Sequence, residues 1–167
     1  IILYLHGYNG SLTPEKRTIL EHYGNVVAPT IDYDDSQFFK KLTAHAQSAD
    51  VIIGSSFGGF TAHQLSLLYN KPALLINPAF VTRSPTPDFQ DLTIPETKTS
   101  HTTVVLGKQD DVIIYRDNLE YVSENLNLDD VRVVEVDNLG HRIPEEIFAE
   151  QVVGFWERIV SLSFTLC

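Results

Sequence analysis

The sequence predicts an α/β protein, a three-layer α/β/α sandwich in which about six mostly parallel strands lie between two layers of helices. Short apolar runs recur along the chain, and helical stretches separate them. Crossovers of this length return a chain to a parallel neighbouring strand, so the alternation favours a parallel sheet. The length of 167 residues fits one core. We therefore expect a single domain over residues 1–167.

The expected strands are short, largely apolar runs, and the first of them is continuous, which is typical of a strand that is buried on both faces. They lie at Ile1–Leu5, Asn25–Ala28, Val51–Ile53, Ala73–Ile76, Thr103–Leu106 and Val131–Val136. Ligands of such sheets bind beyond the carboxyl ends of the strands. The loops after these strands are therefore where a site is expected.

Several of the intervening helices carry signals at their ends. Thr13 precedes Pro14 as a capping residue, and the helix after it is expected to end at Gly24 in a left-handed conformation. Ser36 is expected to cap a helix that runs to Ala49. Further helices are expected over Gly58–Tyr69, over Tyr115–Leu126 and from Pro144 to about Leu162. The last helix carries one apolar stripe, made of Ile147, Phe148, Val152, Phe155, Trp156 and Ile159.

Composition and charge exclude several functions. The chain has 22 Asp and Glu against 12 Lys and Arg, a formal charge of −10, which repels nucleic acid and anionic membranes. It contains no apolar run of the roughly 20 residues that a membrane helix needs and no signal-peptide pattern. We therefore expect no nucleic-acid partner, no membrane insertion and a cytoplasmic location. Cys167 is the only cysteine, so we expect no disulfide and no Cys metal cluster.

The most informative motif follows the third strand. Residues Gly54-Ser55-Ser56-Phe57-Gly58 match Gly-x-Ser-x-Gly with Ser56 at the centre. The pattern needs a tight strand-to-helix turn with a strained central residue, so the positions two before and two after it must lack bulky side chains. Such a turn exposes the hydroxyl at a helix N-terminus, which favours developing negative charge. The alternative is a glycine-rich turn with an ordinary capping serine.

No cofactor or metal site is expected. A dinucleotide fingerprint would need glycine at Ser56 and an acidic residue near Asn77, and the sequence at Gly107-Lys108 lacks the upstream glycine of a P-loop. Four further histidines show no paired spacing typical of metal ligands: His22, His45, His63 and His101.

A serine nucleophile needs a base, which in turn needs an acid to orient it. Asp110 and Asp111 follow one strand and His141 follows the next. The order Ser, Asp, His is the chain order of the α/β-hydrolases. Taken singly, a loop histidine is commonly solvated and paired aspartates commonly cap a helix. The occurrence of a serine, an aspartate and a histidine directly after strands of the same sheet favours a catalytic triad.

The transition state also needs two N–H donors for the oxyanion. One is expected from Phe57, directly after the serine, and the other from Tyr8 in the loop after the first strand. His6, in the same loop, is expected to be structural and to hydrogen-bond the loop.

Five stretches together carry a family resemblance: Leu3-Tyr4-Leu5-His6-Gly7-Tyr8-Asn9, Gly54-Ser55-Ser56-Phe57-Gly58-Gly59, Ile76-Asn77-Pro78-Ala79, Asp110-Asp111-Val112 with Tyr115-Arg116, and Gly140-His141. They resemble the small bacterial esterases of the YqiA type, a UPF0227-like group of the α/β-hydrolase superfamily. The resemblance spans nearly the whole chain except residues 81–101. It implies a compact α/β-hydrolase with the catalytic serine at Ser56, the acid at Asp110 and the histidine at His141.

The predicted activity is that of a serine carboxylesterase or thioesterase. It would cleave a small-molecule ester or thioester through an acyl-enzyme on Ser56, without a cofactor. The alternatives are an acyltransferase or amidase with the same triad, and a catalytically silent binding protein of this fold.

The segment 77–101 is rich in Pro and Thr, and we expect a loop or a minimal cap there. Phe80, Val81 and Phe89 are candidates for lining an apolar substrate groove. The alternative is that they anchor this segment to the core.

Overall fold

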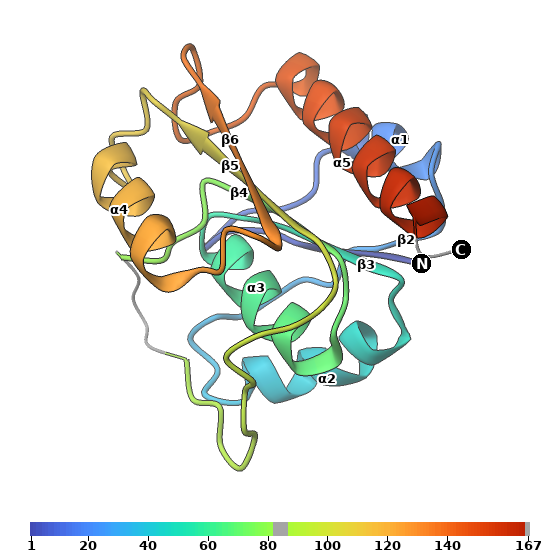
Figure 1. Ribbon diagram of the computed structural model, residues 1–167. Coiled ribbons are helices and arrows are strands. Elements are labelled where there is room, and N and C mark those ends of the chain that lie inside the picture. Colours follow the sequence, from blue (N-terminus) through green and yellow to red (C-terminus); the bar gives the residue numbers. More distant parts are fainter. Residues whose placement is uncertain (82–86, 166–167) are drawn as a thin grey trace.

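The computed structural model describes residues 1–81 and 87–165. Within them, six strands form one parallel sheet in the order β2-β1-β3-β4-β5-β6 (Figure 1). The strands are β1 (Ile2–Leu5), β2 (Val26–Val27), β3 (Val51–Ser55), β4 (Ala73–Ile76), β5 (Thr102–Gly107) and β6 (Val131–Val136). The predicted α/β sandwich is confirmed.

Helices cover both faces of the sheet (Figure 1). They are α1 (Pro14–Glu21), α2 (Phe38–Ser48), α3 (Phe57–Tyr69), α4 (Tyr115–Asn125) and α5 (Glu145–Thr165). Side chains of α1 and α5 pack on one face, and those of α2, α3 and α4 pack on the other. None of the described helices is both long enough and apolar enough to cross a membrane.

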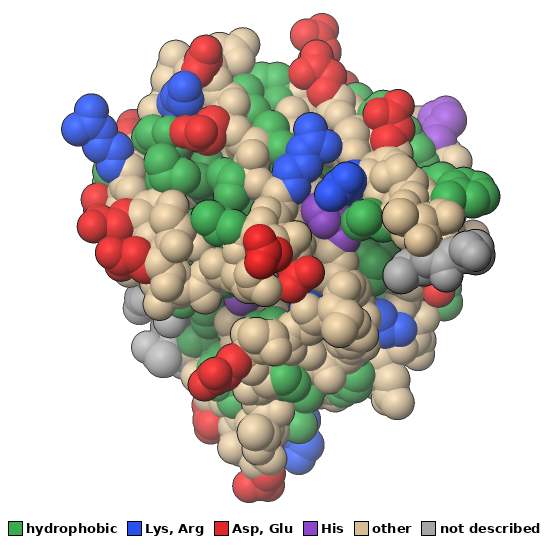
Figure 2. All heavy atoms as spheres, viewed as in Figure 1, with side chains coloured by type: hydrophobic (Ala, Val, Ile, Leu, Met, Phe, Trp, Pro, Cys, Tyr) green, Lys and Arg blue, Asp and Glu red, His purple; other side chains and the backbone are tan. Residues whose placement is uncertain are grey.

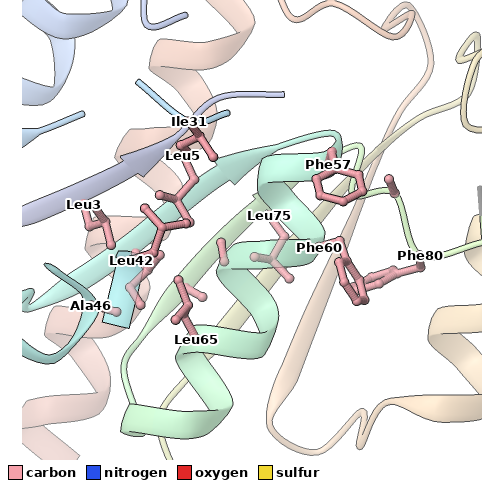
Figure 3. Close-up of a cluster of buried hydrophobic side chains, with 14 of the residues drawn as sticks. Leu3, Leu5, Ile31, Leu42, Ala46, Phe57, Phe60, Leu65, Leu75 and Phe80 are labelled. Carbon is pink, nitrogen blue, oxygen red and sulfur yellow. The ribbon is translucent and has the colours of Figure 1, made fainter. Parts of the chain in front are cut away.

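Two apolar clusters hold the layers together because alternate residues of each strand face opposite sides. Leu3 and Leu5 of β1 join the cluster under α2, α3 and α4, whereas Ile2 and Tyr4 join the cluster under α1 and α5. Figure 3 shows the first of these clusters, with Phe57, Phe60 and Phe80 gathered near the start of α3. The four inner strands β1, β3, β4 and β5 are buried on both faces, whereas the edge strands β2 and β6 are only partly buried.

One predicted helix start is confirmed and one predicted helix end is wrong. The Thr13 hydroxyl accepts a hydrogen bond from the Lys16 N–H at 3.3 Å, as expected of a capping residue. However, α1 ends with right-handed backbone at His22, and the described glycines, Gly24 among them, have no positive φ. The Tyr23 N–H already closes the last turn by donating to a carbonyl oxygen within it, so no left-handed residue is needed.

Ser36 does not cap α2, contrary to the prediction. The helix begins at Phe38, and the preceding Asp35 supplies the acceptors. Its carboxylate accepts from the Gln37 N–H at 2.9 Å, and its carbonyl accepts from the Phe38 N–H at 3.0 Å. An aspartate one position earlier thus replaces the expected serine.

The segment between β4 and β5 contains no helix or strand in its described residues, 77–81 and 87–101. This agrees with the expected loop. From the end of β4 the chain runs past α2 and the end of α3, where Phe89 meets Phe39 and Thr99 bonds Asn70, and its described residues form no helical cap.

Candidate active site

Ser56 lies in the turn between β3 and α3, where the sequence places its nucleophile. Its backbone has φ 57° and ψ −122°, an unfavourable conformation for a residue with a side chain. The Ser56 N–H donates to the Ile76 carbonyl at 2.9 Å, while its side chain makes no capping hydrogen bond to α3. The hydroxyl is therefore not used as a helix cap, which argues against the ordinary capping serine.

The two glycines of the motif are required by close backbone contacts. A Cβ atom on Gly54 would lie 2.2 Å from the carbonyl oxygen of Gly58. A Cβ atom on Gly58 would lie 2.1 Å from the carbonyl oxygen of Leu5. Both distances are far below van der Waals contact, so the turn excludes side chains at these two positions.

Asp110 and His141 come together from the loops after β5 and β6. The Nδ1 atom of His141 lies 3.0 and 2.9 Å from the two carboxylate oxygens of Asp110. Because an ionised carboxylate only accepts, the ring donates its Nδ1 proton. The Nε2 atom of a neutral ring is then left as an acceptor, as a general base requires.

Asp110 is held by its own loop, whereas Asp111 is exposed. The Asp110 Oδ1 atom accepts from the N–H groups of Val112 and Ile113, both at 3.0 Å. The side chain of Asp110 is only 2% exposed, against 19% for that of His141. The structure thus pairs the histidine with the first of the two aspartates.

Ser56 lies between Phe57, the next residue, and the loop of Gly7 and Tyr8. Phe57 is the first residue of α3, and the first N–H groups of a helix have no partner within it. A Cβ atom on Gly7 would lie 3.2 Å from the Cβ of Ser56, so the loop that carries Tyr8 passes directly beside the serine.

The side chain of Tyr8 lies at the protein surface. It is 45% exposed, and its hydroxyl donates to Asp34 at 2.7 Å. This hydrogen bond and the nearby negative charge raise the pKa of Tyr8. The backbone N–H of Tyr8 as an oxyanion donor stays a prediction, and the phenol hydroxyl already bonds Asp34.

His6 is structural, as expected. Its Nδ1 donates to the Gly7 carbonyl at 2.7 Å, and its Nε2 accepts from the Ile31 N–H at 2.8 Å. These partners require a neutral ring with the proton on Nδ1. Both ring nitrogens are occupied, so this histidine shapes the loop beside Ser56.

The aromatic candidates for substrate binding pack into the protein. Phe80 is buried and stacks on Tyr121, with ring centroids 5.1 Å apart. Phe89 is half-buried and meets Phe39 edge to face, with centroids 4.9 Å apart. Val81 is 41% exposed. These positions favour anchoring for the two phenylalanines and leave Val81 at the surface.

Asn77, which the sequence marks only as the end of a strand, also contacts the site. It is buried, and its side chain bonds the carbonyls of Gly140 and His141 and the N–H of Gly107. An asparagine and a proline directly after a buried strand are the only local signal of this arrangement.

Acidic and basic side chains are dispersed over the face seen in Figure 2, in keeping with a formal charge of −10 without one large patch there. Within residues 1–81 and 87–165, no group of three or more His, Cys, Asp or Glu residues is arranged to hold a metal ion.

A family model matches residues 1–93, more than half of the chain, and is described as the uncharacterised protein family UPF0227. The chain belongs to this family. The resemblance expected from the sequence motifs is thereby confirmed at the level of the family.

Solved structures of other proteins show the same fold. A Xanthomonas campestris protein, described as belonging to the hydrolases of the alpha/beta superfamily, has a TM-score of 0.65 at 18% identity and covers 92% of this chain and 98% of its own. Est1E from Butyrivibrio proteoclasticus has a TM-score of 0.67 at 14% identity and covers 96% and 88%. A Bacillus cereus carboxylesterase has a TM-score of 0.61 at 15% identity and covers 94% and 87%. This member of UPF0227 therefore has the α/β-hydrolase fold.

Proposed function

We propose that this protein is a serine hydrolase that cleaves carboxylic esters or thioesters through an acyl-enzyme on Ser56. One observation carries the proposal: a serine in a strained turn, with its hydroxyl free of capping, at the same sheet edge as a hydrogen-bonded Asp110–His141 pair. A strained residue without a structural reason is a sign of function.

The proposed reaction begins with attack of the Ser56 oxygen on the carbonyl carbon. The Nε2 atom of His141 takes the hydroxyl proton and later delivers it to the leaving alcohol or thiol. Asp110 keeps the other ring proton on Nδ1 and stabilises the imidazolium that forms. The N–H groups of Tyr8 and Phe57 stabilise the oxyanion, and water then releases the acid by the reverse sequence.

The comparisons support the hydrolase class and the ester substrate. The structural neighbours include a protein named as a carboxylesterase and one named Est1E. The position of the proposed triad residues after β3, β5 and β6 supports the same proposal. Fold alone is compatible with many chemistries, so the proposal rests on the site residues.

Small, activated substrates are expected to be turned over. The described part of the segment between β4 and β5 has no helix that would cover the site, so a short acyl group should reach Ser56 directly. Suitable substrates are p-nitrophenyl acetate, p-nitrophenyl butyrate and a butyryl thioester of a small thiol.

The test compares two adjacent serines. Ser56→Ala should abolish hydrolysis, because alanine has no nucleophile, while Ser55→Ala should keep substantial activity. Both variants should unfold near the wild-type temperature, measured by circular dichroism. Activity that survives in Ser56→Ala and is lost in Ser55→Ala would contradict the proposal. Product analysis in the presence of added alcohol separates hydrolysis from acyl transfer.

A further inference from the structure

We propose that Asn77 is a positioning residue that sets the distance between the catalytic histidine and serine. Its Nδ2 atom donates to the carbonyl oxygens of Gly140 at 2.9 Å and His141 at 3.0 Å. Its Oδ1 atom accepts from the N–H of Gly107 at 2.7 Å. One buried side chain thus joins the end of β4 to the end of β5 and to the histidine loop. This inference rests on the triad proposed above.

The partners leave no ambiguity in the orientation of the Asn77 amide. Two carbonyl oxygens can only accept and one backbone N–H can only donate, so both amide protons and the amide oxygen are used. The backbone of Asn77 has φ 41°, a left-handed conformation that asparagine tolerates better than most residues do. The chain accepts this conformation at a position where the side chain reaches three backbone groups.

The backbone on either side of Asn77 holds the serine turn. The Ile76 carbonyl accepts from the Ser56 N–H at 2.9 Å, and the Ala79 N–H donates to the Ser56 carbonyl at 2.9 Å. Asn77 therefore connects the segment that fixes the Ser56 backbone with the carbonyl of His141.

Other contacts of the histidine loop run to the loop of the acid. The Leu139 carbonyl accepts from the Gln109 N–H at 2.9 Å, and the His141 ring bonds Asp110. These contacts would keep the Asp110–His141 pair intact if the Asn77 amide were removed. What would be lost is a direct tie from this pair to the serine side of the site.

This arrangement makes a specific prediction. Removal of the amide should leave the protein folded and the acid–base pair formed, but it should let the histidine drift from its productive distance to Ser56. A displacement of about 1 Å can reduce a rate about 10²-fold. A purely structural residue would instead lower the fraction of molecules that are folded and active, without changing the rate of those that remain.

Two variants and a matched control separate these outcomes. Asn77→Gly removes the amide and tolerates the positive φ, and Asn77→Asp keeps the shape but sets a carboxylate oxygen against two carbonyls. The control is Asn70→Gly. Asn70 also has a positive φ, of 50°, and its Oδ1 atom accepts from the N–H groups of Thr99 and Ser100 at 3.1 and 3.0 Å. It closes the opposite end of α3, away from the triad.

The readout is labelling by a fluorophosphonate probe, followed as both a rate constant and a final stoichiometry. Both Asn77 variants should label fully but about 10²-fold more slowly than wild type. Their kcat should fall in parallel, with KM nearly unchanged. The control Asn70→Gly should label at the wild-type rate. Wild-type rate constants in the Asn77 variants would overturn the proposal, and so would a reduced stoichiometry at an unchanged rate or a failure of both variants to fold. A wild-type protein that does not label would instead overturn the proposed function.

Discussion

Replacement of Asp110 by asparagine should reduce kcat for ester hydrolysis about 10⁴-fold. The reason lies in the hydrogen bonds of the carboxylate. Its Oδ1 atom accepts from the Val112 and Ile113 N–H groups, and these donors would hold the oxygen of the asparagine amide in the same place. The amide NH₂ would then occupy the position of Oδ2, which faces Nδ1 of His141 at 2.9 Å.

A ring with its proton on Nδ1 would set that N–H against the amide NH₂, and its other neighbour, Oδ1 at 3.0 Å, already accepts from two backbone N–H groups. The tautomer with the proton on Nε2 is therefore favoured. A ring in that tautomer cannot accept the proton of Ser56. Loss of the acid's charge also removes the stabilisation of the imidazolium. A 10⁴-fold loss corresponds to about 5.4 kcal/mol of transition-state stabilisation.

The assay is steady-state hydrolysis of p-nitrophenyl butyrate at pH 7 to 8, with Asp111→Asn as the matched control. Asp111 is exposed and the described contacts of His141 do not include it, so its variant should keep activity within about twofold, the range expected away from the machinery. Near-wild-type activity in Asp110→Asn, together with an inactive Asp111→Asn, would refute the assignment of the acid.

Three further predictions concern the turn, a buried histidine and the open site. Gly58→Ala should lower the free energy of unfolding by at least about 3 kcal/mol, because its Cβ would overlap a backbone oxygen. In the control Gly154→Ala the new Cβ meets nothing within 4 Å, so the free energy of unfolding should rise by about 0.5–1 kcal/mol. A wild-type free energy of unfolding for Gly58→Ala in denaturant titrations would contradict the tight geometry of the turn. Burial lowers the pKa of His63 to about 4, so the unfolded chain binds more protons between pH 6.5 and 4 and stability should fall by about 3 kcal/mol as the pH drops through that window. Burial also lowers the pKa of His101 to about 4, so His63→Gln should reduce the slope without abolishing it, and an unchanged slope would refute the contribution of His63. Activity should rise smoothly with ester concentration, and a jump once the ester exceeds its solubility would indicate a lid that must open.

The sheet and the candidate triad are predictable because their signals are local. The run Ala73–Ile76 coincides with β4, since a strand buried on both faces needs continuous apolar sequence. Val131–Val136 coincides with β6, an edge strand that leaves Arg132 and Glu135 exposed. Gly-x-Ser-x-Gly is equally local: close backbone contacts exclude side chains at Gly54 and Gly58. Asp110 and His141 follow later strands, and the carboxyl ends of parallel strands share one edge of a sheet, so the topology predicts that these residues meet there.

Other features depend on partners that a local pattern does not reveal. Ser36 and Asp35 are both good capping residues, and only the path of the chain decides that the aspartate accepts the bonds. Phe80 enters the core because Tyr121 offers a stacking surface in a distant helix. Asn77 bonds residues 30 to 64 positions along the chain, so its neighbours in the sequence mark the end of a strand but do not identify its partners.

The proposed mechanism requires that Ser56 carry the acyl group during turnover. The most direct test is to mix the protein with p-nitrophenyl butyrate, quench with acid within the first turnovers and analyse the peptides by mass spectrometry. We expect one butyryl group on the peptide that contains Ser56, located on Ser56 by fragmentation and absent from Ser56→Ala. Turnover of the ester with the butyryl group on another residue, or with the same rate in Ser56→Ala, would contradict the mechanism.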